Sequence, residues 1–193
     1  TAIGVFLEIV PTYDKQFGIR CNGSTDDFYY YVYGPVWAAI GVDGAELFEI
    51  KVQATTDKLW LTGYMKSGAT FLVNSTDKSL TTTGAWTDLA ALPSGATGGF
   101  FIMKGGFVGT DMGLRKNGST EDIYEGNLGY WHNRGAFIEC DASQLIEGKI
   151  FATTIDFYLV GYTAAVAAGP ANLKTYNTNL KANIKSINTN LIA

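Results

Sequence analysis

The feature that most constrains this chain is an internal repeat. Residues 18–27 (GIRCNGSTDD) align with residues 113–122 (GLRKNGSTED), and seven of the ten pairs are identical. After a small insertion the similarity continues, because residues 43–64 resemble residues 141–162 at an offset of 98. Self-similarity of this kind is typical of a repeated structural unit. The chain is therefore predicted to be two copies of one module, formed by duplication and followed by a tail.

Each copy is composed of short runs of β-forming residues. Residues 5–10 and 100–103 are continuous apolar runs, too short for helices and bounded by Gly or Pro, which predicts buried central strands. Residues 59–64 and 157–162 are dense in β-formers and are predicted to close each copy. Several strands at a spacing of roughly 8 to 12 residues predict an all-β fold of two tandem, jelly-roll-like β-sandwich modules.

The repeat also predicts turns and a core. The Asn-Gly pairs at 22–23 and 117–118 predict type I′ turns that open β-hairpins. Cys21 and Cys140 are not at equivalent positions, so we expect two buried free thiols rather than a disulfide. Eight apolar residues are expected to be almost fully buried, namely Phe6, Ile40, Leu47, Leu61, Phe101, Ile138, Leu145 and Leu159.

The domain boundaries follow from the copies. Residues 1–66 form the first module, residues 67–165 the second, and residues 166–193 the C-terminal tail. Residues 71–98 have no counterpart at the start of the first copy, so the first module is predicted to lack its opening strands. A sheet without a strand exposes unpaired backbone groups and the edge of an apolar core, and proteins normally cover such an edge.

Several motifs of the second copy stand in a fixed order. They are residues 86–89 (WTDL), a turn at residues 93–96 (PSGA), an apolar strand, residues 113–120 (GLRKNGST) and residues 157–162 (FYLVGY). This pattern resembles a β-sandwich module that occurs, often in tandem, in structural proteins of tailed phages and related viruses. The resemblance covers residues 71–163 and, without the opening, residues 4–64. It implies a virion structural component such as a tail, fibre or capsid-decoration protein, and it implies no catalytic residues.

Composition argues against several other functions. The 193 residues carry a formal net charge of -4, so no basic surface is expected to attract a nucleic acid. No apolar run approaches the ~20 residues of a membrane-spanning helix. A single histidine, His132, and two cysteines do not suffice for a zinc site. We expect no enzyme activity, cofactor, metal or membrane partner, and the start at Thr1 fits either removal of an initiator Met or a cleaved leader.

Charged residues recur around the Asn-Gly turns. Acidic side chains that could bind Ca²⁺ follow the turns at Asp26, Asp27, Glu121 and Asp122. We favour the interpretation that these turns hydrogen-bond their own backbone. Arg20 and Arg115 are predicted to pair with a carboxylate across the hairpin. The acid and base two residues apart on one strand, Glu49 with Lys51 and Glu147 with Lys149, are predicted to be surface pairs, and neither glutamate marks a catalytic cleft.

An aromatic cluster offers a different kind of candidate site. Tyr30 and Tyr31 of the first copy and Trp131 of the second are predicted to lie in matching loops. Such rings form a candidate platform on which the sugar rings of a glycan stack. Packing in the core or at a subunit interface, which aromatic residues also dominate, is the interpretation we favour.

The tail differs in composition from the rest of the chain. Residues 172–193 contain six Asn and three Lys and no acid, so the tail carries +3 against -7 for the remainder. Tyr176, Leu180 and Ile184 alternate as in a strand, whereas Leu180, Ile184, Ile187 and Leu191 fit the a/d seam of a coiled coil. We favour a strand donated to the first module of a neighbouring copy over a trimeric coiled-coil stalk.

These expectations combine into one predicted function. The chain is predicted to be a non-enzymatic structural subunit at the surface of a virion, as a capsid-decoration, tail or fibre protein. Its predicted partners are further copies of itself and other virion proteins, with a cell-surface glycan as an additional candidate. The alternative is a carbohydrate- or receptor-binding module of a fibre or of a secreted protein.

Overall fold

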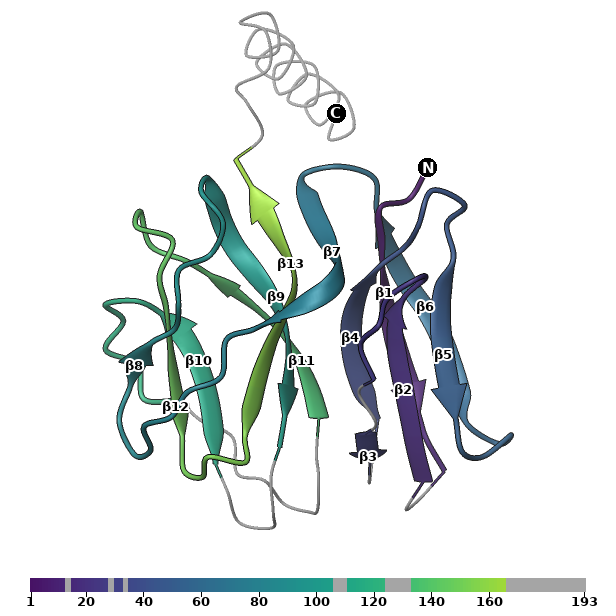
Figure 1. The fold of residues 1–193 in the computed structure, drawn as a ribbon, viewed down its shortest axis with the longest axis horizontal. Helices are drawn as coiled ribbons and strands as arrows, with labels where there is room; N and C mark the ends of the chain where they lie inside the picture. Colours follow the sequence, from purple (N-terminus) through teal and green to yellow (C-terminus); the bar gives the residue numbers. More distant parts are fainter. Residues whose placement is uncertain (13–14, 28–29, 33–34, 106–110, 124–132, 166–193) are drawn as a thin grey trace, which may run out of the picture.

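The protein is an all-β chain (Figure 1). The computed structural model describes residues 1–12, 15–27, 30–32, 35–105, 111–123 and 133–165, and none of these residues lies in a helix. The first half contains β1 (Gly4–Val10), β2 (Lys15–Cys21), β3 (Tyr30–Val32), β4 (Val36–Gly41), β5 (Phe48–Val52) and β6 (Lys58–Met65). The second half contains β7 (Ala69–Asp77), β8 (Thr87–Asp88), β9 (Ala96–Lys104), β10 (Met112–Lys116), β11 (Asn133–Glu139), β12 (Ile146–Ile150) and β13 (Asp156–Ala164).

The strands form two sheets in each half, and all their pairings are antiparallel. The sheets of the first half run β4-β1-β6 and β3-β2-β5. Those of the second half run β11-β9-β13-β7 and β10-β12-β8. Successive strands of the second half alternate between its two sheets. The result is a β-sandwich-like arrangement, as the sequence predicts.

Strand β9, inside the sheet β11-β9-β13-β7, is buried on both faces. Phe101 and Leu159 point into the core of the second half, whereas Phe100 and Ile102 belong to a core shared with the first half. A strand that is apolar on both faces reads in sequence as a continuous hydrophobic run. The central strand predicted at residues 100–103 is therefore confirmed.

Strand β7 lies at the junction of the two halves (Figure 1). The ring of Phe71 on β7 stacks on Phe100, with ring centroids 5.2 Å apart. Gly4 and Gly41 of the first half lie so close to Phe71 that a side chain at either position would collide with it. This close packing makes Phe71 one of the residues that join the halves, together with Phe100, Ile102 and Val160 of the shared core. Strands β5 and β6 lie at the opposite side of the first half, away from the junction.

The predicted hairpin turns are wrong in type. Gly23 and Gly118 each have a φ of 77°, but the non-glycine residues described with positive φ are Glu46 and Gln144, not the two asparagines. A type I′ turn needs positive φ at both central residues, so these are turns of the type II pattern. The strand that follows the first turn, β3, pairs only with the far end of β2, and β10 pairs with β12 alone. The predicted two-residue hairpins are therefore absent from the described residues.

The predicted core is correct at three of its eight positions. Ile40, Phe101 and Leu159 are buried. Phe6, Ile138 and Leu145 are only half-buried. Phe6 and Ile138 pack against the edges of the two core clusters, and Leu145 directly precedes β12. Leu47 and Leu61 are wrong as core residues, since both are more than half exposed. Both corrections concern the same region, where no described strand covers β5 or β6.

Two further expectations can be compared with the structure. Cys21 and Cys140 are free and buried, which confirms the prediction of two buried thiols. Desolvation by burial raises the pKa of both thiols above the ordinary value. In the described part of the chain, no helix has the length and apolar character needed to cross a membrane.

Candidate functional site

The first half lacks two strands that the second half has. The order β4-β1-β6 matches β11-β9-β13, but the second half adds β7 beyond β13. Likewise β2-β5 matches β10-β12, and the second half adds β8 beyond β12. Within the described residues, no strand pairs with the outer side of β5 or of β6. We call residues 48–65, which contain these two strands, the open edge.

Apolar side chains on the open edge are exposed at positions that are buried in the second half. Leu61 is 63% exposed, whereas Leu159 at the aligned position is 1% exposed. Val52 is 45% exposed, whereas the aligned Ile150 is fully buried. Because the paired residues are similarly apolar, the difference arises from what covers them. In the second half residues 69–92 provide the cover.

A groove of about 520 Å³ follows the open edge. Its lining includes the apolar residues Val5, Leu7, Phe48, Leu59, Leu61 and Tyr64. In the second half, Leu72, Leu80, Leu89 and Leu92 from the extra segment pack into the core. A Cβ on Gly148 would lie 3.0 Å from Leu89 and 3.2 Å from Leu80.

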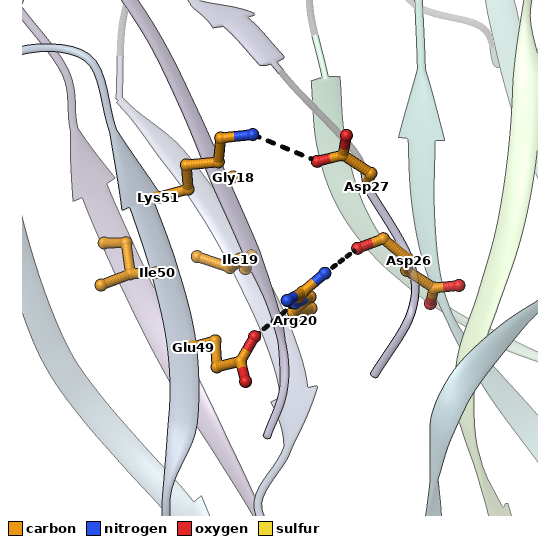
Figure 2. A pocket seen from close by; sticks show the side chains of 8 residues that line it. All are labelled: Gly18, Ile19, Arg20, Asp26, Asp27, Glu49, Ile50 and Lys51. Carbon is orange, nitrogen blue, oxygen red and sulfur yellow. Dashed lines mark hydrogen bonds and ion pairs between the residues drawn. The ribbon is translucent and has the colours of Figure 1, made fainter. Parts of the chain in front are cut away.

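A polar pocket of about 320 Å³ lies beside the same strands (Figure 2). Arg20 on β2 donates from Nε to Glu49 on β5 over 2.5 Å, and from a terminal nitrogen to the backbone oxygen of Asp26 over 2.8 Å. Lys51 pairs with Asp27 at 3.4 Å. The hydrogen bond from Arg20 lowers the pKa of the Glu49 carboxyl below its ordinary value. These contacts hold the guanidinium plane of Arg20 in place at the pocket, which we call the Arg20 pocket.

The aligned site of the second half has the same ion pair and an aromatic cover. Arg115 donates from Nε to Glu147 over 2.6 Å, as Arg20 does to Glu49. Trp86, from the extra segment, stacks on Arg115 with the guanidinium carbon 4.3 Å from the ring centroid. Its indole nitrogen donates to Asp122 over 2.6 Å, and this bond is the main cause that lowers the pKa of the Asp122 carboxyl.

The aromatic cover changes the exposure of the charged groups. The side chain of Arg115 is 16% exposed, against 37% for Arg20. The side chain of Lys149, which also faces the Trp86 ring, is 12% exposed, against 55% for Lys51. The Arg20 pocket therefore repeats the charges of Arg115, Glu147 and Asp122, and no ring of the described residues stacks on Arg20 as Trp86 stacks on Arg115.

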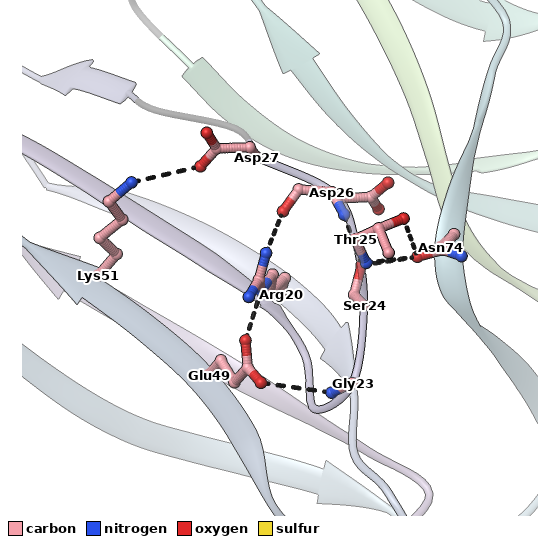
Figure 3. A network of polar contacts seen from close by, with 9 residues as sticks. All are labelled: Arg20, Gly23, Ser24, Thr25, Asp26, Asp27, Glu49, Lys51 and Asn74. Atoms are coloured by element: carbon pink, nitrogen blue, oxygen red, sulfur yellow. Dashed lines mark hydrogen bonds and ion pairs between the residues drawn. The ribbon is translucent and has the colours of Figure 1, made fainter.

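A polar network connects the turn of the first half to β7 (Figure 3). Asn74 on β7 accepts from the hydroxyl of Ser24 at 3.0 Å and from the backbone nitrogen of Thr25 at 2.8 Å. Asp26 accepts from the backbone nitrogen of Ser75 at 2.7 Å. Strand β7 thus contacts the half that it follows in sequence, while its ladder pairs with β13 of the other half.

The acidic turns have structural partners. Asp26 and Asp27 bind Ser75 and Lys51, and Asp122 binds Trp86 and Lys149. No group of three or more His, Cys, Asp or Glu residues in the described chain is arranged to hold a metal ion. The predicted pairing of each arginine with a carboxylate is present, but the partner is Glu49 or Glu147 on the neighbouring strand. Lys51 binds Asp27 and Lys149 binds Asp122, and the predicted pairing of each lysine with the glutamate of its own strand stays a prediction.

Most of the predicted binding residues are outside the described part. Tyr30 and Tyr31 lie on β3, but their side chains are not described. Trp131 and the tail residues Tyr176, Leu180, Ile184, Ile187 and Leu191 lie outside the described residues. These assignments therefore stay predictions.

Sequence reasoning missed an aromatic row on the sheet β4-β1-β6, on the face of β1 that also carries Phe6, which contacts Phe100 of the second half. Trp37 and Trp60 both pair in register with Glu8, so the three side chains lie across the sheet on one face. Each tryptophan is 55% exposed. The alternation of β4 and β6 was sufficient to place both rings outward, but the shared register with Glu8 was not visible in the sequence.

Comparison with known proteins identifies no relative. No family model matches the chain, and neither a curated protein nor a solved structure is similar to it.

Proposed function

We propose that this chain is a non-enzymatic structural subunit that assembles with copies of itself, as a capsid-decoration, tail or fibre component at the surface of a virion. The observation that carries the self-assembly is the exposure of Leu61 against the burial of Leu159. Exposed apolar edges of a sheet are sites where another chain pairs. The virion assignment rests on the resemblance of residues 71–163 to modules of phage structural proteins.

We also propose that the two halves are copies of one jelly-roll-like module and that residues 1–66 lack its opening strands. Support comes from details that recur at aligned positions. Asn22 donates to Asp43 and Asn117 donates to Asp141, at 2.5 and 2.8 Å. The positive φ of Glu46, 64°, recurs at the aligned Gln144, 61°. A repeat at this level of backbone and hydrogen bonding supports duplication of a whole module.

Self-assembly is testable with one substitution and its control. Leu61→Lys places a charge in the groove of the open edge, whereas Ile123→Lys changes a side chain that is 69% exposed elsewhere. Sedimentation velocity of the full chain should show oligomers for the wild type and for Ile123→Lys, and monomers for Leu61→Lys. Oligomers of unchanged stability in Leu61→Lys would exclude the open edge as the assembly surface, and a monomeric wild type at 100 µM would exclude self-assembly.

The location is testable on particles. Mass spectrometry of purified virus particles from the source of the chain should detect the protein in a fixed ratio to the major capsid protein. Its absence from purified particles would contradict the virion assignment. The protein would then be expected to assemble in another extracellular structure.

One observation favours carbohydrate binding as a second candidate function. Trp37 and Trp60 flank the Glu8 carboxylate across three strands, which separates the two backbones by about 10 Å. Exposed rings beside a polar group provide stacking and hydrogen bonding for a sugar. Glycan-array binding that disappears in both Trp37→Ala and Trp60→Ala would support this function. Absence of any bound glycan would reject it.

A further inference from the structure

The segment that completes the second half follows the first half in sequence. Strands β7 and β8 come directly after β6, yet they pair with β13 and β12 rather than with β6 and β5. Residues 69–92 therefore leave one half and complete the next. The 28 residues of the tail, 166–193, follow β13 in the same way and have about the same length as that segment. Within the described residues, no strand pairs with the outer side of β5 or β6, and the tail follows the last strand of the second half as residues 69–92 follow the last strand of the first.

We propose that the tail of one copy completes the open edge of the first half of the next copy, head to tail, and that Tyr176 of the tail fills the Arg20 pocket as Trp86 fills the site at Arg115. This inference rests on the proposed self-assembly and names its partner. It extends the order found once within the chain, in which residues 69–92 complete the half that follows them.

The Arg20 pocket has the chemistry to hold an aromatic side chain. Arg20 is fixed by Glu49 and by the backbone oxygen of Asp26, so its guanidinium plane is preorganised. A ring that stacks on such a plane gains cation–π attraction. No ring of the described residues lies over Arg20, whereas Trp86 lies over Arg115. Asp27 stands where Asp122 accepts the indole proton, so the preferred ring carries a hydrogen-bond donor.

Tyr176 meets these requirements. It is the only aromatic residue in residues 166–193, and its hydroxyl can donate to the Asp27 carboxylate. In an extended segment Leu180 and Ile184 alternate on the same side as Tyr176, at a spacing suited to an apolar groove. The tail carries +3 and the remainder of the chain -7, so association is favoured by charge.

Strand β7 also contacts the turn of the first half, and no described residue makes the corresponding contact with the turn of the second half. Ser24 and Thr25 donate to Asn74. In the sequence, Asn74 follows the end of β6 at about the same spacing as Asn172 follows the end of β13. The aligned turn of the second half contains Ser119, whose hydroxyl accepts from Glu121 as that of Ser24 accepts from Asp26. No described residue takes the place of Asn74 at this turn. An asparagine at the start of the tail provides the missing acceptor as the tail leaves its own second half.

Photochemical cross-linking of the full chain tests where residue 176 lies. Tyr176 is replaced by p-benzoylphenylalanine, and the protein is mixed as ¹⁴N- and ¹⁵N-labelled copies before irradiation. Mass spectrometry should identify cross-links from position 176 to residues 18–27 or 49–51, in peptide pairs that combine both labels. The same probe at Leu191 should give a different set of cross-linked residues and serves as the control.

The outcomes separate this inference from the proposed function. Cross-links from position 176 to the tail of another copy would overturn donation in favour of a coiled-coil stalk, while self-assembly would stand. Cross-links within one copy only would overturn the exchange between copies. Cross-links to residues 58–65 without any to the Arg20 pocket would retain tail donation and reject the pocket as the seat of Tyr176.

Substitutions give an independent measure. Tyr176→Ala should raise the dissociation constant of the assembly about tenfold, equivalent to about 1.4 kcal/mol, because a ring stack and a hydrogen bond are lost. Tyr176→Trp, which copies the residue found in the second half, should assemble as tightly as the wild type. Asp27→Asn should weaken assembly less than Tyr176→Ala, since it changes only the acceptor. An unchanged dissociation constant for Tyr176→Ala would overturn the assignment of the pocket.

Discussion

The sharpest test of the open edge compares one substitution at two aligned positions. Leu61 and Leu159 occupy the same place on β6 and β13, and both are replaced by alanine in the full chain. Leu61 is 63% exposed and Leu159 is 1% exposed. If the open edge is uncovered in a single copy, the two substitutions must differ in their effect on the free energy of unfolding of the monomer.

The magnitudes follow from the buried area. Leu→Ala removes three carbon groups, which is about 2.4 kcal/mol of transfer free energy at about 0.8 kcal/mol per group when the side chain is fully buried. Leu159→Ala adds a cavity term, so the expected loss is about 3 to 5 kcal/mol. For Leu61, with little more than a third of the side chain buried, the expected loss is about 0.9 kcal/mol and no closed cavity forms.

The assay is urea unfolding followed by tryptophan fluorescence, at a dilution where sedimentation shows a monomer. The core of the first half includes Phe100, Ile102 and Val160 of the second half, so we expect one cooperative transition and comparable m-values. At concentrations where the chain assembles, Leu61→Ala should also raise the dissociation constant, while Leu159→Ala should act mainly on folding.

Equal losses in the monomer would refute this reasoning. They would mean that a segment of the same copy already covers Leu61, and the groove would then be filled within one chain. A loss below 1 kcal/mol for Leu159→Ala would instead contradict the burial of β13.

Two further predictions concern other parts of the molecule. Gly135→Ala should destabilise the chain by about 1 to 3 kcal/mol in thermal or urea unfolding, because a Cβ at this position collides with the backbone carbonyl of Trp37 where β11 meets β4; a neutral effect would contradict that close approach. Burial, followed by the Asp156 and Asp77 carboxylates, raises the pKa of Tyr158 to about 12, so the folded state binds this proton more tightly than the unfolded state and stability should fall as pH rises from about 10 to 12. Comparison with Tyr158→Phe separates the pH dependence of stability due to Tyr158 from that due to the lysines. Identical pH profiles of stability for the wild type and Tyr158→Phe would show that Tyr158 does not cause the loss.

The sequence was sufficient to predict the strands. The runs at residues 5–10 and 100–103 fall within β1 and β9, and those at 59–64 and 157–162 within β6 and β13. These runs were easy to identify because strands packed within a sandwich are apolar at most positions. The turns were less predictable, since Asn22 and Asn117 use their side chains to bond Asp43 and Asp141 and keep negative φ.

Burial at the open edge could not be predicted from the repeat. Alignment with Leu159 correctly gives Leu61 as an apolar residue of the last strand, but it cannot show which segment covers that strand. The same holds for the Arg20 pocket. Trp86 reaches Arg115 only because β8 pairs with β12 in one register, with Thr87 opposite Gly148, and nothing local in the sequence determines that register.

The composition of most of β6 fits the proposal that a segment of another copy covers its exposed edge. Natural edge strands are protected by charged residues, by proline or by bulges that twist the edge away. Strand β6 begins with Lys58 and its pairing with β1 contains one shift of register, but residues 59–65 contain no charge and no proline and resemble the aligned interior strand β13. A head-to-tail contact covers this edge in every copy only if the copies close into a ring, because an open filament leaves one uncovered edge and one unused tail at its ends. Under the proposed head-to-tail contact, protection of β6 in every copy therefore requires a closed ring rather than an open filament.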